Sequence, residues 1–150
     1  MEFVINEWLP EYFKPDCSVE QKNLLNKFIL KFFEKNDQIF VRNPSPFLDK
    51  LYRFEKNYFE PKLRRPVSFF IQNILENSDK CVQIMEEISL PHGINNLLSK
   101  GNFASDTYLF EAATLTNSKK IITTDIKLIK QFEGNDTYEL ILLEDFLKEY

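Results

Sequence analysis

Apolar residues recur along the chain at two different spacings, which predict strands alternating with helices. Runs of adjacent apolar or β-branched residues, which are typical of buried strands, lie at 2–5, 38–42, 120–124 and 138–142. A three-to-four-residue repeat over 19–35, opened by a Ser-x-x-Gln capping sequence, predicts a long helix with one buried face. The order strand, helix, strand is the expected beginning of a parallel sheet.

The remaining elements follow from the same spacings and from the prolines. A helix is expected after Pro44 or Pro46, because proline is favoured in a first helical turn. Further helices are expected at 67–76, 80–88, 126–132 and 143–150, with a proline-bounded connection at 58–66. We therefore predict one α/β domain spanning 1–150, with three α/β/α layers around a central, mostly parallel sheet of about four strands.

The segment 105–130 organises the predicted chemistry. Ser105 is a good helix N-cap, so a helix is expected to begin at Asp106, and Asp125 follows directly on the strand after that helix. Ligands of open parallel sheets bind at the carboxyl ends of the strands. We therefore expect Asp125 at that edge, with Asp106 beside it.

This segment resembles the C-terminal half of PIN domains, a family of small metal-dependent nucleases. The resemblance lies in an Asp that opens a helix (Asp106), the apolar run 109–113, and an apolar strand ending in Thr-Thr-Asp at 123–125. It implies that Asp106 and Asp125 hold Mg²⁺ or Mn²⁺, and that Thr123 or Thr124 hydrogen-bonds a ligand carboxylate or a metal-bound water. Carboxylate oxygens suit such hard cations chemically.

The first acidic position of that family is altered here. A PIN domain ends its first strand with a metal-binding Asp, whereas this chain has Asn6 there, followed by Glu7. An Asn carbonyl ligates a cation without contributing charge, so Glu7 is the candidate that restores the charge. The alternative is that Asn6 is simply a turn or capping residue.

The second acidic position of the family lies near the start of the helix after the second strand. Asp49 is the closest match, and Glu55 is a rival more than one turn later. Alternatively, Asp49 interacts only with the helix dipole or with Arg53 four residues on. Asp106 and Asp125 also have alternatives to metal binding. Asp106 would interact favourably with the dipole of its helix as a first-turn acid, and Asp125 would cap the helix that follows it.

The densest basic cluster consists of Lys62, Arg64 and Arg65 beside aromatic residues. Such a cluster suits a nucleic-acid backbone and its bases, although a solvated loop is the plain alternative. The net charge of −4 argues against broad non-specific binding of nucleic acid but not against an acidic cation site.

Composition narrows the class of protein. With 43% hydrophobic residues and only 3 Gly, the chain is neither disordered nor fibrous. Cys17 and Cys81 lack metal-ligand spacing and fit a reduced, cytoplasmic protein, and no apolar run is long enough for a membrane span. His92, the single histidine, receives no role.

The leading functional prediction is a divalent-metal-dependent endoribonuclease acting on RNA. The resemblance also allows the toxin half of a toxin–antitoxin pair, with an antitoxin or other protein partner, and a homodimer. The main alternative is a PIN-like binding or assembly module with weakened catalysis, since Asn6 replaces an acid. A phosphatase or receiver-like domain is a third reading, but Asp125 leaves room for only one more strand after it.

Overall fold

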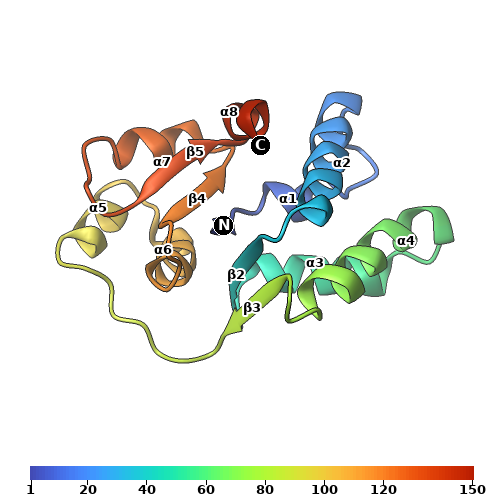
Figure 1. The fold of residues 1–150 in the computed structure, drawn as a ribbon, viewed down its shortest axis with the longest axis horizontal. Coiled ribbons are helices and arrows are strands. Elements are labelled where there is room, and N and C mark those ends of the chain that lie inside the picture. The colour runs from blue at the N-terminus through green and yellow to red at the C-terminus, as the bar shows by residue number, and fades with distance from the viewer.

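Five short parallel strands form a single sheet in the structure, a computed structural model that describes residues 1–150 (Figure 1). The strands are β1 (Glu2–Ile5), β2 (Gln38–Arg42), β3 (Cys81–Ile84), β4 (Lys120–Thr123) and β5 (Glu139–Leu142). Their order across the sheet is β3-β2-β1-β4-β5, and every neighbouring pair is parallel. The predicted α/β class is therefore confirmed, with one strand more than the expected four.

Helices cover both faces of this sheet, which gives the predicted three layers. They are α1 (Trp8–Glu11), α2 (Val19–Glu34), α3 (Pro46–Asn57), α4 (Pro61–Phe70), α5 (Ile94–Lys100), α6 (Thr107–Thr114), α7 (Ile126–Gln131) and α8 (Leu143–Glu149). Figure 1 shows α3 and α4 extending beyond β2 and β3, whereas α5 and α7 lie beside β4 and β5. No helix combines the length and apolar character needed to cross a membrane.

Successive side chains of β1 pack against opposite faces of the sheet, because neighbouring residues of a strand point to opposite sides. The buried Phe3 ring contacts Phe28 and Phe32 of α2, and Phe146 of α8. Val4 instead shares a small cavity wall with Tyr108 and other residues on the α6 side. A 38-residue apolar core thus lies on both sides of the sheet.

The predicted helix at 80–88 is wrong, because its first part is strand β3. Val82, Met85 and Ile88 repeat at helical spacing, yet Cys81 to Ile84 pair with β2 in register from Ile39 to Arg42. This strand lies at the edge of the sheet, and only its first and last residues are buried. A four-residue edge strand has too few positions for its period of two to compete with a longer helical pattern.

The predicted connection at 58–66 is also wrong in part. Pro61 occupies the first turn of α4, where a missing N–H costs nothing, and Pro66 lies inside the same helix. The helix continues into a π-helical turn, Ile71–Leu75. The predicted helix at 67–76 therefore exists but begins about one and a half turns earlier.

The start of α6 differs slightly from the prediction. A short 3₁₀ turn, Ala104–Asp106, precedes it, so Asp106 rather than Ser105 holds the N-cap position. The Asp106 side chain makes no capping hydrogen bond. Its carboxylate is consequently not committed to the end of its own helix.

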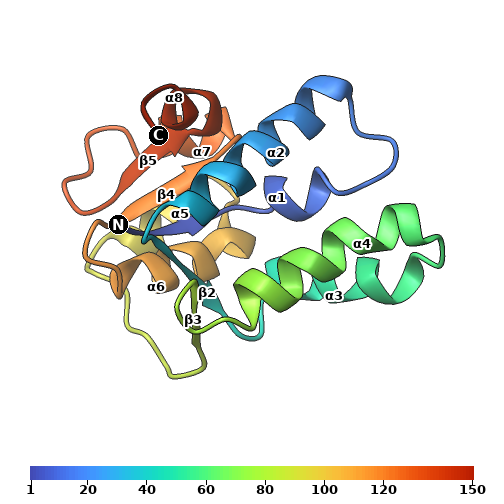
Figure 2. The same cartoon turned by 45° about the vertical axis from the view of Figure 1, so that its right-hand side comes forward.

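The chain adds strands first on one side of β1 and then on the other. Figure 2 shows the chain moving from β1 through β2 toward β3, and β4 then pairs with β1 on its other side. In open α/β sheets such a switch point leaves a crevice outside the carboxyl ends of the two strands. Trp8, the single tryptophan, lies at this point, 4% exposed, and donates its indole N–H to the carbonyl of Ile122 at 3.0 Å.

Candidate functional site

The candidate site lies where β1 and β4 end. Ile5 pairs with Ile122, so the next residue of each strand, Asn6 and Thr123, emerges at the same level. The Asn6 backbone N–H still donates to the carbonyl of Ile122, at 3.0 Å. Beyond this level, Glu7 follows β1 and Asp125 follows β4.

Asn6 and Thr123 form a buried polar link between the two strand ends. Asn6 is 8% exposed and donates from Nδ2 to Thr123 Oγ1 at 2.9 Å. Its Oδ1 accepts the backbone N–H of Glu7 at 2.6 Å, and Thr123 Oγ1 also accepts the N–H of Asp125 at 3.0 Å. Both polar ends of Asn6 are therefore engaged in holding the edge together. Thr124 is exposed, so Thr123 is the threonine placed beside the acids.

Two carboxylates at this edge, Asp125 and Glu7, act on a third, Asp106. The pKa of Asp106 is raised to about 6, first by burial, then by the negative charge of Asp125, and then by that of Glu7. Asp125 also caps α7, because its Oδ1 accepts the N–H of Leu128 at 3.1 Å. Like charges in a half-buried setting disfavour ionisation, which is why the Asp106 carboxyl holds its proton to a higher pH.

Tyr108 adds a polar group without a partner to the same place. It is 9% exposed, and its hydroxyl is buried with no hydrogen-bond partner. Burial, then the charges of Glu7 and Asp106, and last a weak hydrogen-bond interaction with Glu7 raise its pKa. The Glu7 carboxylate lies outside proper hydrogen-bond geometry, so the hydroxyl counts as unpartnered. Buried hydroxyls are normally hydrogen-bonded, so an unpartnered one beside two acids is a donor to which a nearby acceptor could bond.

Lys50 brings a positive charge to the site from α3. Its Nζ lies 2.9 Å from Glu7 Oε1 and 2.6 Å from Glu11 Oε1, while Lys14 lies 2.6 Å from the other Glu11 oxygen. The Lys50 and Glu7 side chains are only 27% and 25% exposed. One of the three carboxylates is thus neutralised by an ammonium group within the chain.

Asp49 does not take part in this arrangement. Phe47, Leu48 and Leu51 are the buried residues of α3, and at about 100° per residue the position of Asp49 falls on the opposite side of the helix. Asp49 is exposed and makes no ion pair or side-chain hydrogen bond. Lys50, on the flank of the buried face, is the residue of this turn that reaches Glu7.

The donor types at this edge suit a hard divalent cation, but the ligand set is smaller than the sequence predicted. Asp106, Asp125 and Glu7 supply carboxylate oxygens. However, no three His, Cys, Asp or Glu side chains are arranged as a ready-made metal-binding group. The pair Asp106 and Asp125, with uncompensated charge beside an unpartnered hydroxyl, fits a cation best.

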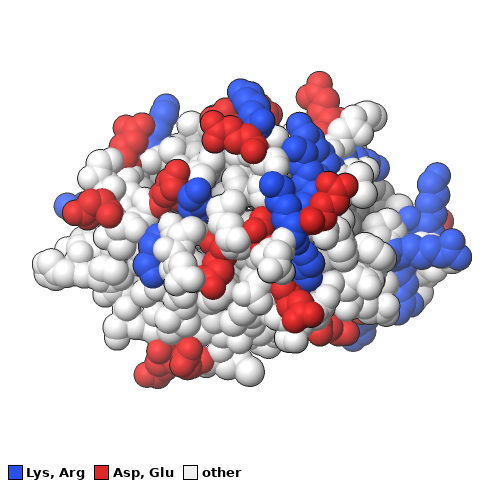
Figure 3. All heavy atoms as spheres, in the orientation of Figure 1, with Lys and Arg blue, Asp and Glu red and all other residues white.

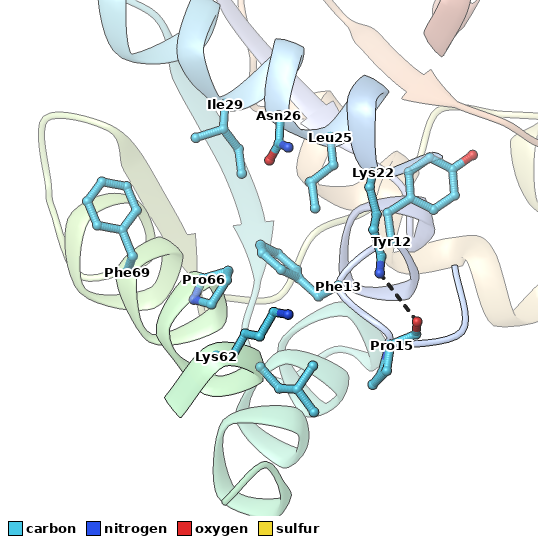
Figure 4. Close-up of a pocket in the computed structure, with 11 residues that line it drawn as sticks. Tyr12, Phe13, Pro15, Lys22, Leu25, Asn26, Ile29, Lys62, Pro66 and Phe69 are labelled. Atoms are coloured by element: carbon cyan, nitrogen blue, oxygen red, sulfur yellow. Dashed lines mark hydrogen bonds between the residues drawn. The ribbon is translucent and has the colours of Figure 1, made fainter. Parts of the chain in front are cut away.

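A separate groove lies between α2 and α4, away from these acids. Its cavity of about 360 Å³ has mainly apolar walls, including Phe13, Leu25 and Phe69, and no acidic residue lines it. Figure 4 shows Lys62 reaching across it toward Phe13, and Lys22 pointing to the Pro15 carbonyl, to which it donates at 3.3 Å.

The predicted basic cluster lies on the first turns of α4. Lys62, Arg64 and Arg65 are all exposed and form no ion pairs. Figure 3 shows Lys and Arg side chains gathered at the end of the molecule where α3 and α4 meet. The cluster is thus a helical surface and not a loop.

Two residues of the site were missed by sequence reasoning, Lys50 and Tyr108. The buried positions of α3 already place residue 50, not 49, on the flank of its apolar face. Tyr108 is in the first turn of α6, next to Asp106, but it reads as one more aromatic core residue.

Comparisons with known proteins add no relative. No protein-family model matches the chain. No curated protein and no solved structure matches it either.

Proposed function

We propose that this chain is a PIN-like, divalent-metal-dependent endoribonuclease. The observation that carries the proposal is the meeting of Asp106, Asp125 and Glu7 at the switch point of the sheet, where the pKa of Asp106 rises to about 6. The resemblance of segment 105–130 to PIN domains supplies the reaction class. Uncompensated carboxylates would repel a phosphodiester, so a cation is needed for them to act on one.

The chain's own residues have distinct tasks in this proposal. Asp106 and Asp125 would hold Mg²⁺ or Mn²⁺, which when bound supplies charge neutralisation and an activated water. Asn6 and Thr123 fix the two strand ends that carry these acids. The Tyr108 hydroxyl, having no partner, is available to donate to a substrate oxygen or a bound water.

Mn²⁺-dependent cleavage of a generic single-stranded RNA tests the proposal. Asp106→Asn and Asp125→Asn are each expected to reduce cleavage on the order of 100-fold, because each removes a charged ligand. Asn is as good an N-cap as Asp, so α7 should stay intact in Asp125→Asn. Asp49→Asn is the matched control and should retain activity. Equal cleavage by all three variants would overturn the proposal.

A second candidate is a PIN-like module that binds RNA or a protein partner without cleaving. Two observations favour it. Thr123 and the Glu7 N–H already occupy both polar ends of the neutral Asn6 side chain, and the ion pair of Lys50 with Glu7 reduces the negative charge available for a cation. Absence of Mn²⁺-dependent cleavage above the Asp125→Asn background would favour this module.

The proposal extends to the cellular role and to the substrate surface. As a toxin of a toxin–antitoxin pair, the protein should arrest growth when expressed alone, and Asp125→Asn should relieve the arrest. An antitoxin and a homodimer remain proposed partners. The exposed Lys62, Arg64 and Arg65 are proposed to contact the RNA backbone, so their joint replacement by Ala should weaken RNA binding and reduce its salt dependence.

A further inference from the structure

Two basic residues at the carboxyl edge of the sheet, Arg42 and Lys50, differ in how many of their N–H donors already have partners within the chain. Arg42, at the end of β2, donates to the carbonyls of Ile84 and Glu86 and pairs with Glu111 at 3.5 Å. It therefore serves to tie β3 and α6 to β2. Lys50 has only its two glutamate contacts, so one of the three N–H donors of its ammonium group is left over.

Lys50 is also placed to meet a ligand of the acids. Its partner Glu7 directly follows Asn6, whose side chain is bonded to Thr123, and Thr123 also accepts the N–H of Asp125. The ammonium group therefore lies at the edge of the sheet where the acids emerge and not on a remote surface. The side chain is 27% exposed, which leaves a path to it. Its carboxylate partners hold it in one direction, so little rotamer freedom remains to be lost on binding.

We propose that Lys50 is the phosphate-binding residue of this site, contacting a non-bridging oxygen of the phosphodiester that the acids act on. This inference rests on the proposed function. The ammonium group supplies positive charge to the phosphate directly. Without it, the site would need a further carboxylate to bind a second cation in the same place. The site then operates with fewer acidic ligands than the sequence led us to expect, because one of its positive charges is covalently part of the chain.

Binding of a ten-nucleotide single-stranded RNA, measured by filter retention with CaCl₂ in place of MnCl₂, tests Lys50 while a divalent cation compensates the acids. Gel electrophoresis of the recovered RNA establishes that it stays uncleaved. Lys50→Met keeps the length of the side chain and removes its charge, and it should weaken binding roughly 10- to 100-fold, the usual range for one hydrogen bond to a charged group. The salt dependence of binding should fall by about one phosphate contact. Lys50→Arg should stay close to wild type.

Two further variants separate phosphate binding from a structural role. Lys120→Met is the matched control, because Lys120 opens β4 at the opposite edge of the sheet, and it should bind like wild type. Glu11→Gln removes one partner of Lys50 but keeps the ammonium group, so it should bind RNA at least as tightly as wild type. Circular dichroism melts establish that each variant is folded.

Titration calorimetry with MnCl₂ gives a second readout. Lys50→Met should tighten Mn²⁺ binding several-fold, because Glu7 is released and a neighbouring positive charge is removed. RNA affinity that is unchanged in Lys50→Met, or equally reduced in Lys120→Met, would overturn the role of Lys50.

The outcomes also distinguish this inference from the proposed function. RNA binding that depends on Lys50, without any Mn²⁺-dependent cleavage, would retain Lys50 as a phosphate ligand and remove the nuclease. Cleavage that is lost in Asp125→Asn, with RNA affinity independent of Lys50, would retain the nuclease and remove Lys50 as a phosphate ligand. Wild-type protein that binds no RNA would overturn both.

Discussion

Asn6 donates a hydrogen bond from its side-chain amide to the hydroxyl of Thr123 at 2.9 Å, which joins the ends of two strands that lie 117 positions apart in the sequence. Neither residue is charged, and both are buried. The link holds Glu7 and Asp125, the next acids along each strand, at one edge. The acidic site therefore depends on a neutral pair.

Replacing Thr123 with Val should destabilise the fold by about 2–3 kcal/mol. The change keeps the shape of the side chain but leaves the Asn6 amide and the Asp125 N–H without their acceptor. Urea unfolding measures the loss. Thr124→Val, at an exposed neighbour, should change stability by no more than about 0.5 kcal/mol, and an equal loss in both variants would contradict the role of the link.

Asn6→Asp should restore the charge that the first strand end lacks, at a cost in stability. A buried carboxylate beside Glu7 and Asp106 has a raised pKa, so the variant should lose about 1–3 kcal/mol at pH 7 and less at pH 5. Mn²⁺ should recover much of this loss, since a cation that binds only the folded state stabilises it. Thermal melts with and without MnCl₂ check this, and a loss unaffected by Mn²⁺ would argue against a cation at this edge.

The raised pKa of Asp106 makes stability depend on pH. Its folded pKa of about 6 lies above the ordinary value of 3.8, so between these values the folded state binds more protons than the unfolded state. Stability should therefore fall as the pH rises from about 4 to 6 and should stay reduced above 6. For a half-buried group the effect should be about 1–2 kcal/mol after allowing for solvent screening.

Asp106→Asn isolates this contribution, because the other titrating groups are common to both proteins. Chemical unfolding at pH 4.5, 5.5 and 7 should give a variant that is more stable than wild type at pH 7, with the difference shrinking toward pH 4.5. A constant difference across these values would show that the pKa of Asp106 is not raised in the folded protein.

Tyr108→Phe separates stability from function. The hydroxyl has no partner in the structure, so its removal should leave stability unchanged or raise it by up to about 1 kcal/mol. If the hydroxyl bonds a substrate oxygen or a bound water, RNA cleavage should nevertheless fall about 10-fold or more. A loss of stability above 1 kcal/mol would mean that the hydroxyl is satisfied within the fold.

The sequence was most informative where one period dominates a segment. The strands at β1, β2, β4 and β5 and the helix α2 lie close to their predicted positions, because each is a run of one pattern bounded by a clear cap or break. β3 was mistaken for a helix because Val82, Met85 and Ile88 fit a helical repeat, and only pairing with β2 makes its first residues a strand. That pairing is a long-range contact, which local periodicity does not contain.

In the candidate site, too, some residues could be predicted from chain order, and others depend on how a helix packs. Asp106 and Asp125 could be expected together because chain order alone puts both near the end of β4. Asp49 is the closest positional match to the second acidic position of the family, but the rotation of α3 about its axis decides which residue faces the acids. That rotation follows from the burial of Phe47, Leu48 and Leu51, and it brings Lys50 to Glu7.

The buried indole of Trp8 gives this protein an optical probe in the right place. It is the single tryptophan, it is bonded to the carbonyl of Ile122, and it directly follows Glu7. Its emission should therefore respond when a cation or nucleotide arrives at the strand ends, and no label would be needed. Ligand screening could begin with unmodified protein in a fluorimeter, with the six tyrosines avoided by excitation near the red edge of the indole band.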